Sequence, residues 1–434
     1  MTSELYPSFS NMRSQFNCLT LMNFIQHIQI MQISGVRKMV LSKKAMQISP
    51  SLTLDITAKA KKMRAEGIDV IGFGAGEPDF NTPKNIQDAA IKAIQEGMTR
   101  YTATSGIIEL KQAIVKKLKE ENNLNYIPSQ IIVSTGAKQS LANALSAILN
   151  PGDEVLIGVP YWVSYPELVK LADGEPIYVE TKESNEFKLT IESLNSALTL
   201  KTKAIILNSP NNPTGTVYSK DELIKIAEFA KVNNLIIISD EIYEKLIYGD
   251  TGHISIASLS EDAYARTIVI NGVSKAYAMT GWRIGYTAAS KEIVALMTNI
   301  QSHTTSNPNS IAQYASVEAL NGQQDDIHKM VEQFKLRRDY MVERINNIKN
   351  LSCIKPEGAF YVMVNISEVL NKSLEGIVIK DSLVFSELLL NKEKVAVIPG
   401  VAFGVDNFIR LSYATSMENI KNGLNRIARF AENI

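Results

Sequence analysis

The residues best suited to chemistry are Lys275 and Arg283, which lie eight positions apart in a segment of mostly small side chains. A β-branched run, residues 267–271, precedes the lysine and predicts a buried strand that ends at Gly272. We therefore expect Lys275 in a turn at the carboxyl end of that strand, the edge at which open α/β sheets bind ligands.

The two side chains suit different groups of one ligand. A lysine in a semi-apolar pocket is less readily charged, and its neutral amine is a nucleophile towards an aldehyde. The fork geometry of Arg283 suits a phosphate. An aldehyde and a phosphate together indicate pyridoxal 5'-phosphate (PLP), although a surface lysine beside a turn arginine would give the same short pattern.

Asp240 follows a second apolar run, residues 235–239, so we expect its carboxylate at the same sheet edge as Lys275. A buried carboxylate needs a partner, and a pyridinium nitrogen would serve, keeping the ring protonated and able to accept electrons. Tyr243 is within reach of the cofactor's 3-oxygen if a helical turn follows. A helix start with an N-capping carboxylate is the alternative.

Two loops offer further groups for such a ligand. Asn212, in a proline-rich loop after a predicted strand, carries an uncharged donor suited to the same ring oxygen. Gly136, Ala137 and Lys138 join a strand to a helix, and free amides at a helix N-terminus can cradle a phosphate. An ordinary turn asparagine and an ordinary strand-to-helix turn are the alternatives.

Two residues near predicted strands complete the candidate set. Trp162 follows a strand at the same edge and can stack on an aromatic ring, with core packing as the alternative. Arg410 lies inside the apolar run 408–412 and needs an anionic partner. A substrate carboxylate bound through two hydrogen bonds would serve, as would a structural salt bridge.

Strand and helix patterns alternate through the middle of the chain, which indicates an α/β fold with a mostly parallel sheet and helices on both faces. We expect a large domain at residues 85–325 and a smaller α+β domain at 326–434. Residues 39–84 are predicted to form an N-terminal arm and part of the small domain. Residues 1–38 read as a disordered or non-native extension, with Met39 as the initiator.

The composition excludes several classes of function. The 45 lysines and arginines balance 45 aspartates and glutamates, which leaves no electrostatic footprint for nucleic acid or an anionic membrane. Cys18 and Cys353 are too few for a disulfide scaffold and fit a reducing cytoplasm. The four histidines have no metal-ligand spacing, so we expect no metal. Residues 15–34 match neither a membrane span nor a signal peptide.

Six motifs occur in order along the chain: Gly-Glu-Pro-Asp-Phe, Tyr-Trp-Val-Ser-Tyr-Pro, Asn-Ser-Pro-Asn-Asn-Pro-Thr-Gly, Ser-Asp-Glu-Ile-Tyr, Ser-Lys-Ala-Tyr-Ala-Met-Thr-Gly-Trp-Arg-Ile-Gly-Tyr and Arg-Leu-Ser-Tyr-Ala. With them the chain, from about residue 40 to its end, resembles the class I aminotransferases of the fold-type I PLP enzymes, particularly bacterial aspartate aminotransferases. The resemblance implies a seven-stranded sheet in the large domain.

The resemblance also implies a role for each candidate. Lys275 would form the aldimine with PLP and then shuttle the proton, with Asp240 on the ring nitrogen. The other implied cofactor contacts are Asn212 and Tyr243 on the ring oxygen, Trp162 on the ring face, and Gly136, Ala137, Lys138, Ser274 and Arg283 around the phosphate. Arg410 would bind the substrate's α-carboxylate, assisted by Asn212, Gly76 and Trp162. Tyr101 would reach the phosphate of a neighbouring subunit, which implies a homodimer with shared active sites.

The implied reaction is transfer of an amino group from L-aspartate to 2-oxoglutarate by a ping-pong route. Residues 301–313 contain no arginine for the distal carboxylate, and Lys138 matches the lysine that bacterial members use instead. Some relatives act on prephenate through a lysine before a Pro-Ser pair, and Ser49 at that place argues against this activity. An aromatic or branched-chain aminotransferase and a carbon–sulfur β-lyase remain alternatives. A PLP-sensing transcription regulator would need a DNA-binding domain, for which residues 1–38 are too short and insufficiently basic.

Overall fold

The computed structural model describes residues 41–434 except 51, 250 and 251. The predictions for residues 1–38 and for Met39 therefore lie outside the described residues. The chain divides into two compact units, one through Gln47 and the other from Ile48 to Ile434. The described part of the first contains the short helix α2 (Lys43–Met46), whose first turn is capped by the Ser42 side chain.

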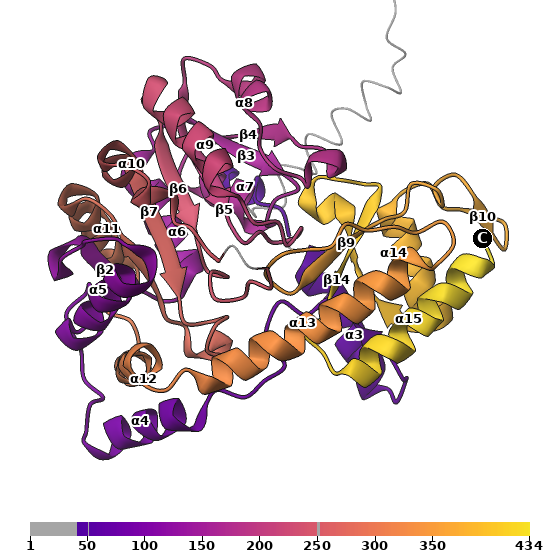
Figure 1. Ribbon diagram of the computed structural model, residues 1–434, viewed down its shortest axis with the longest axis horizontal. Coiled ribbons are helices and arrows are strands. Elements are labelled where there is room, and N and C mark those ends of the chain that lie inside the picture. Colours follow the sequence, from indigo (N-terminus) through magenta and orange to yellow (C-terminus); the bar gives the residue numbers. More distant parts are fainter. Residues whose placement is uncertain (1–40, 51, 250–251) are drawn as a thin grey trace, which may run out of the picture. The chain divides into compact units, whose positions relative to one another are not determined.

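A seven-stranded sheet forms the centre of the second unit, in the order β2-β8-β7-β6-β5-β3-β4 (Figure 1). Its strands are β2 (Ile131–Ser134), β3 (Glu154–Val159), β4 (Glu175–Glu180), β5 (Thr202–Asn208), β6 (Ile236–Asp240), β7 (Thr267–Gly272) and β8 (Gly285–Ala288). Only β8 among them runs antiparallel to its neighbours, β2 and β7. The expected mostly parallel, seven-stranded sheet is therefore confirmed.

Strands β5 and β3 are apolar along most of their length because both faces of the sheet are covered. Successive side chains alternate between faces. Leu156 and Ile205 pack with Leu223 and Ile226 of α9 (Lys220–Val232) on one face. Ile157 and Ile206 pack on the other face with Leu141 of α6 (Ala137–Ile148) and Leu168 of α7 (Ser164–Leu171). The helices of this part are α4 (Lys84–Gln95), α5 (Ile108–Asn122), α6 (Ala137–Ile148), α7 (Ser164–Leu171), α8 (Ile191–Ala197), α9 (Lys220–Val232), α10 (Glu261–Arg266), α11 (Lys291–Thr304) and α12 (Ser310–Asn321).

The long helix α13 (Asp325–Asn346) leads from this sheet to a second core, formed largely by the C-terminal part of the chain (Figure 1). Here β9 (Tyr361–Asn365), β13 (Ile398–Pro399) and β14 (Phe408–Ser412) form an antiparallel sheet in the order β13-β14-β9. The remaining elements are the hairpin β10 (Ser373–Leu374) and β11 (Ile377–Val378), strand β12 (Val395–Ala396), and helices α14 (Ser382–Glu393) and α15 (Met417–Glu432).

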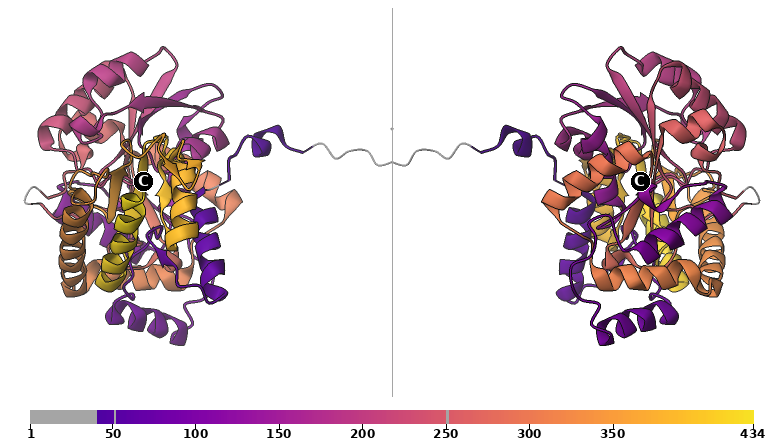
Figure 2. Two further views of the ribbon diagram at one scale, coloured as in Figure 1. Left: turned by 90° about the vertical axis from the view of Figure 1, so that its right-hand side faces the viewer. Right: turned by 90° about the vertical axis from the view of Figure 1, so that its left-hand side faces the viewer.

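An N-terminal segment of the second unit joins this C-terminal core. Strand β1 (Ile71–Gly72) pairs in parallel with β12. Helix α3 (Leu52–Ala65) packs Ala60 in one cluster with Leu390 of α14, and Figure 2 shows it in indigo beside the orange and yellow elements. Residues after α3 therefore reach the region between the two cores. Within the described residues, no helix is both long and apolar enough to cross a membrane.

Candidate active site

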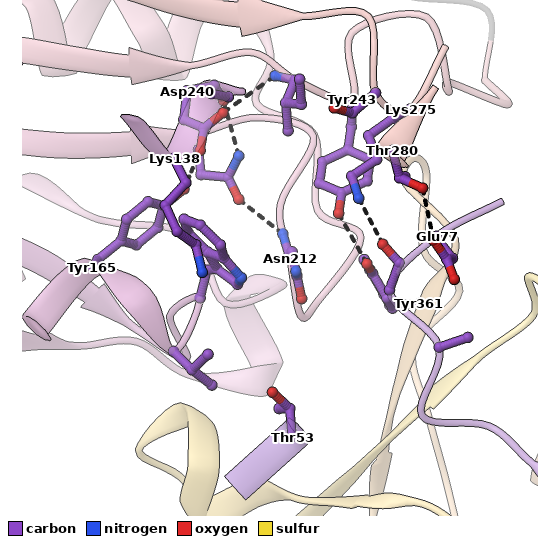
Figure 3. Close-up of a pocket in the computed structure, with 18 of the residues that line it drawn as sticks. Thr53, Glu77, Lys138, Tyr165, Asn212, Asp240, Tyr243, Lys275, Thr280 and Tyr361 are labelled. Atoms are coloured by element: carbon purple, nitrogen blue, oxygen red, sulfur yellow. Dashed lines mark hydrogen bonds between the residues drawn. The ribbon is translucent and has the colours of Figure 1, made fainter. Parts of the chain in front are cut away.

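A cavity of about 470 Å³ opens where strands β5, β6 and β7 end (Figure 3). Both cores contribute to its wall. The residues that line it are Thr53, Thr57, Gly74, Ala75, Gly76, Glu77, Ala137, Lys138, Leu141, Trp162, Val163, Tyr165, Asn208, Asn212, Asp240, Ile242, Tyr243, Ser274, Lys275, Thr280, Arg283, Tyr361, Phe403 and Arg410. The cavity thus brings together most of the predicted site residues, taken from segments more than three hundred positions apart.

Lys275 lies in the turn after β7, as its sequence context predicts. Its Nζ donates a hydrogen bond of 2.6 Å to the carbonyl of Gly76. Burial lowers the pKa of Lys275 to about 8, with the cations Arg283 and Arg410 adding to the effect and Glu77 opposing it. A substantial fraction of the amine is therefore neutral near pH 8 and able to attack a carbonyl carbon.

Asp240 is the last residue of β6 and is buried. The Tyr165 hydroxyl donates to its Oδ2 at 2.7 Å, and the Ile242 amide donates to Oδ1 at 3.3 Å. Burial nevertheless raises the pKa of Asp240 to about 6. Because no cation is in hydrogen-bond contact with the carboxylate in the described residues, a protonated ring nitrogen would be a favourable partner.

Tyr243 follows in a turn rather than in a helix, and its side chain reaches the same cavity. Its hydroxyl lies 2.9 Å from the hydroxyl of Tyr361 on β9. The Nζ of Lys275 lies 5.9 Å from the centre of the Tyr243 ring. Burial raises the pKa of Tyr243 well above its ordinary value, so the phenol stays neutral and keeps a proton to donate.

Arg410 is 3% exposed on β14 and has no carboxylate partner among the described residues. Its guanidinium donates to the Asn212 side-chain oxygen and to the Gly74 carbonyl, each at 3.0 Å. Its Nε has no hydrogen-bond partner. A buried guanidinium whose only acceptors are neutral is suited to an incoming carboxylate.

The turn between β2 and α6 lies beside the guanidinium of Arg283. Gly136 has a φ of +81°, and a Cβ placed there would lie 2.8 Å from Arg283 Cζ. Arg283 itself has a φ of 59° and donates from Nη1 to the Thr280 carbonyl at 2.8 Å. A side chain at residue 136 would therefore fill the space in which the amides of the α6 N-terminus and this guanidinium converge. That space suits a phosphate.

Lys138 and Trp162 form another part of the wall. The Nζ of Lys138 lies over the Trp162 ring, 5.0 Å from its centre. Burial lowers the pKa of Lys138, and Arg283 lowers it further. Lys138, Lys275, Arg283 and Arg410 give this cavity four cationic side chains against the two carboxylates Glu77 and Asp240. The cavity is therefore built for an anionic ligand.

Tyr101, a predicted site residue, does not line the cavity and is 91% exposed. The segment after it is fixed by two buried glutamines of the arginine-free stretch 301–313. Gln301 donates to the carbonyls of Thr104 and Val133, both at 2.8 Å, and Gln313 accepts from the Ile107 amide at 2.8 Å. These side chains bind main chain instead of facing the cavity.

Comparison with known proteins identifies the family. A model of the family "aminotransferase class I and II" matches residues 68–427. The chain belongs to this family. The aspartate aminotransferase of Bacillus sp. (strain YM-2) is 51% identical over 395 residues, which cover 91% of this chain and all of the relative.

Two further comparisons agree with this assignment. The aspartate aminotransferase of Bacillus subtilis (strain 168) is 50% identical over 91% of this chain and 99% of its own length. The crystal structure of the enzyme of that name from Rhizobium meliloti is 43% identical and superposes with a TM-score of 0.88, over 91% of this chain and all of that one. The resemblance inferred from the six motifs is confirmed, and the protein is an aminotransferase.

Three cavity residues of this aminotransferase were not identified from its sequence. Tyr165 contacts Asp240, Tyr361 contacts Tyr243, and Glu77 accepts a 2.7 Å hydrogen bond from the Thr280 hydroxyl. Tyr165 stands three positions after Trp162, so a helical turn there would have placed both side chains on one face. Glu77 lies inside the first of the six motifs, but a lone glutamate beside a proline gives no signal of its own.

In this aminotransferase, ion pairs behind the cavity fix the turn that carries Asp240 and Tyr243. The alternate residues Glu241 and Glu244 face away, where Glu244 pairs with Lys117 of α5 and Glu241 pairs with His253 at 3.0 Å. Although burial alone would raise it, the charge of Lys117 lowers the pKa of Glu244 to about 2. Two carboxylates and two basic groups thus balance each other behind the cavity.

Proposed function

We propose that this aminotransferase uses PLP to transfer the amino group of L-aspartate to 2-oxoglutarate by a ping-pong route. The names of the relatives support aspartate as the donor, because both Bacillus proteins that are about half identical are aspartate aminotransferases. The observation that carries the proposal is one cavity with a buried lysine of lowered pKa, a buried aspartate and an arginine that lacks a carboxylate partner among the described residues.

The residues present fit PLP. Its phosphate would lie at Gly136, Ala137, Ser274 and Arg283, where the glycine leaves the room that a Cβ would fill. Asp240 would pair with the ring nitrogen, and Asn212 and Tyr243 would reach the ring oxygen. When bound, PLP supplies an aldehyde for the amino group and a ring that accepts electrons.

The chain's own groups would then bind, orient and move a proton. Lys275 would give up its place to the substrate's amino group and act as the base at the α-carbon, since its lowered pKa keeps it partly neutral. Trp162 would hold the ring face from one side. Asp240 would hold a proton on the ring nitrogen through its charge, although burial raises its own pKa in the absence of that partner.

Arg410 and Lys138 would select a dicarboxylic substrate. Arg410 would bind the α-carboxylate with both Nη groups, exchanging the neutral acceptors Asn212 and Gly74 for a charged one. Lys138 lines the same cavity and would bind the distal carboxylate. Because Arg410 and Lys138 are both needed, a substrate without a second carboxylate would bind less tightly.

A homodimer with shared active sites is part of the proposal. Tyr101 is almost fully exposed in one chain, and the large apolar side chains Ile91, Ile94 and Met98 of the preceding segment are exposed with it. A partner that covered this segment would bury apolar surface and give Tyr101 a phosphate to bind. We further propose residues 85–325 as the large domain, residues 326–434 as the small domain, residues 39–84 as the N-terminal arm and part of the small domain, and the cytoplasm as the compartment.

An absorbance titration tests the reaction. The purified protein with PLP is expected to show a visible band that bleaches when L-aspartate is added and returns when 2-oxoglutarate is added. Lys275→Ala is expected to lose at least about four orders of magnitude in turnover, because nucleophile and base are both removed. Lys291→Ala, an exposed lysine at the start of α11, serves as the control and is expected to behave as wild type. Near-wild-type turnover by Lys275→Ala would end the proposal.

The amino donor is tested separately, because a few cavity residues can change side-chain preference. A panel of aspartate, aromatic and branched-chain amino acids is expected to give aspartate the highest kcat/KM. A higher value for an aromatic donor would replace aspartate in the proposal. Release of pyruvate and ammonia from cystathionine would indicate a carbon–sulfur β-lyase instead.

A further inference from the structure

Tyr361 lines the cavity but has no part in the reaction proposed above. It is fully buried on β9, in the C-terminal core, and its hydroxyl lies 2.9 Å from that of Tyr243 (Figure 3). Its ring also lies under Arg410, with the guanidinium carbon 4.4 Å from the ring centre. One side chain therefore contacts both the proposed ring-oxygen donor and the proposed carboxylate binder.

The direction of the hydrogen bond between the two phenols decides what Tyr243 can do. Each phenol has one proton, and in the described residues neither hydroxyl has another hydrogen-bond partner. If Tyr243 donated to Tyr361, its proton would be used within the pair. If Tyr361 donates, the proton of Tyr243 is free to reach a ligand in the cavity.

The charge of Arg410 favours donation by Tyr361. A guanidinium over an aromatic face stabilises negative charge on that ring, and the phenol beneath it becomes the stronger donor. The Arg410 cation lowers the pKa of both phenols against the larger, raising effect of burial. Tyr361 is the phenol in direct contact with the guanidinium, so it is the better donor of the two.

We propose that Tyr361 is a positioning residue whose hydroxyl donates to Tyr243, so that the Tyr243 proton points at the ring oxygen of the bound cofactor, and whose ring holds Arg410 for the substrate carboxylate. This inference rests on the proposed function. Its two parts belong to different atoms of Tyr361, the hydroxyl and the ring, and can be removed one at a time.

The hydroxyl is tested with Tyr361→Phe, Tyr243→Phe and the double variant. The measurement is the pH midpoint at which the visible absorption band of the bound cofactor changes. A hydrogen bond to the ring oxygen draws charge from it and weakens its hold on a nearby proton. Tyr361→Phe is therefore expected to raise the midpoint by roughly 0.1–0.3 pH unit and Tyr243→Phe by more, because Tyr361→Phe removes only the hydrogen bond that polarises the Tyr243 hydroxyl, whereas Tyr243→Phe removes the bond to the ring oxygen itself. The double variant is expected to match Tyr243→Phe alone, because the Tyr361 hydroxyl acts only through Tyr243.

The ring is tested with Tyr361→Leu, which removes the aromatic face under Arg410. This variant is expected to raise KM for aspartate about tenfold through loss of the cation–π contact, whereas Tyr361→Phe keeps KM within about twofold of wild type. Tyr413→Phe is the matched control, since it removes a buried hydroxyl that donates to the Ala359 carbonyl at 3.2 Å in the same core but outside the cavity. It is expected to change neither the midpoint nor KM.

Four outcomes would overturn the inference. They are an unchanged midpoint in Tyr361→Phe, additive shifts in the double variant, an equal shift in Tyr413→Phe, and an unchanged KM in Tyr361→Leu. Failure of the wild-type protein to bind PLP would instead overturn the proposed function, so the two results are distinguishable.

Discussion

Burial shifts the pKa values of Lys275 and Asp240 in opposite directions. It lowers the pKa of the lysine to about 8 and raises that of the aspartate to about 6, because a low-dielectric site disfavours any charged form. The two groups lie at the ends of adjacent parallel strands, so one cavity holds both. Both pKa values move towards neutrality, which is typical of groups that exchange protons during a reaction.

The rate at which PLP combines with the cofactor-free protein is predicted to follow the charge of Lys275. Only the neutral amine attacks the aldehyde, so the rate should rise with pH and level off above a midpoint of about 8. Stopped-flow absorbance at several pH values measures it. A midpoint near 10.5, the ordinary lysine value, would contradict the burial argument.

Because of Asp240, the free energy of unfolding of the cofactor-free protein is predicted to fall as pH rises. Its folded pKa of about 6 exceeds its ordinary value of 3.8, so the folded state binds the proton more tightly than the unfolded state. The protonated carboxyl contributes about 3 kcal/mol of stability. This contribution is fully present below about pH 4 and is lost as pH rises through about 6. Urea unfolding of wild type and Asp240→Asn across this range measures the difference. If the difference does not change between these pH values, the prediction is wrong.

At the scale of elements, the turn at residues 240–244 is fixed from two sides. Asp240 and Tyr243 face the cavity, whereas Glu241 and Glu244 face α5 and the residues around His253. Lys117 and Glu244 are both buried, and Asn122 donates to Glu244 at 2.8 Å. Because a buried ion pair holds its geometry tightly, α5 helps to position side chains that it does not touch.

Lys117→Met is predicted to destabilise the protein by about 3–5 kcal/mol, because it leaves Glu244 buried without its cation. Denaturant unfolding measures the loss, and PLP affinity is expected to fall with it. Lys245→Met is the matched control, since Lys245 pairs with the more exposed Glu121 and should cost less than about 1 kcal/mol. Equal losses of stability in both variants would show that the buried Lys117–Glu244 pair does not stabilise the turn more than an exposed pair does.

At the scale of the whole molecule, the cavity depends on both cores. Tyr361 and Arg410 come from the C-terminal sheet, whereas Lys275, Asp240 and Tyr243 come from the ends of the large sheet. Gly74 and Gly76, from the segment after β1, bind Arg410 and Lys275 through their carbonyls. The proposed dimer would add Tyr101 as a contribution from a second chain.

Mixing two variants, each altered in a different residue of the proposed shared site, tests whether the site is shared. A hybrid dimer of Lys275→Ala and Tyr101→Ala chains would have one site with both changes and one with neither. Random reassociation is therefore predicted to restore about a quarter of the wild-type sites. Activity is measured before and after unfolding and refolding the mixture. Activity no higher than the mean of the two parents would contradict a site shared between subunits.

The sequence determined the alternation of strands and helices, the sheet edge on which Lys275 and Asp240 lie, and the family, because these follow from local pattern and ordered motifs. It did not predict strand β8, which has only four residues and exists because it pairs with β2 and β7 on either side. Nor did it identify Tyr361, whose partners Tyr243 and Arg410 are distant in the chain. Only packing brings those side chains together, since hydrogen bonds and cation–π contacts over such separations leave no local trace in the sequence.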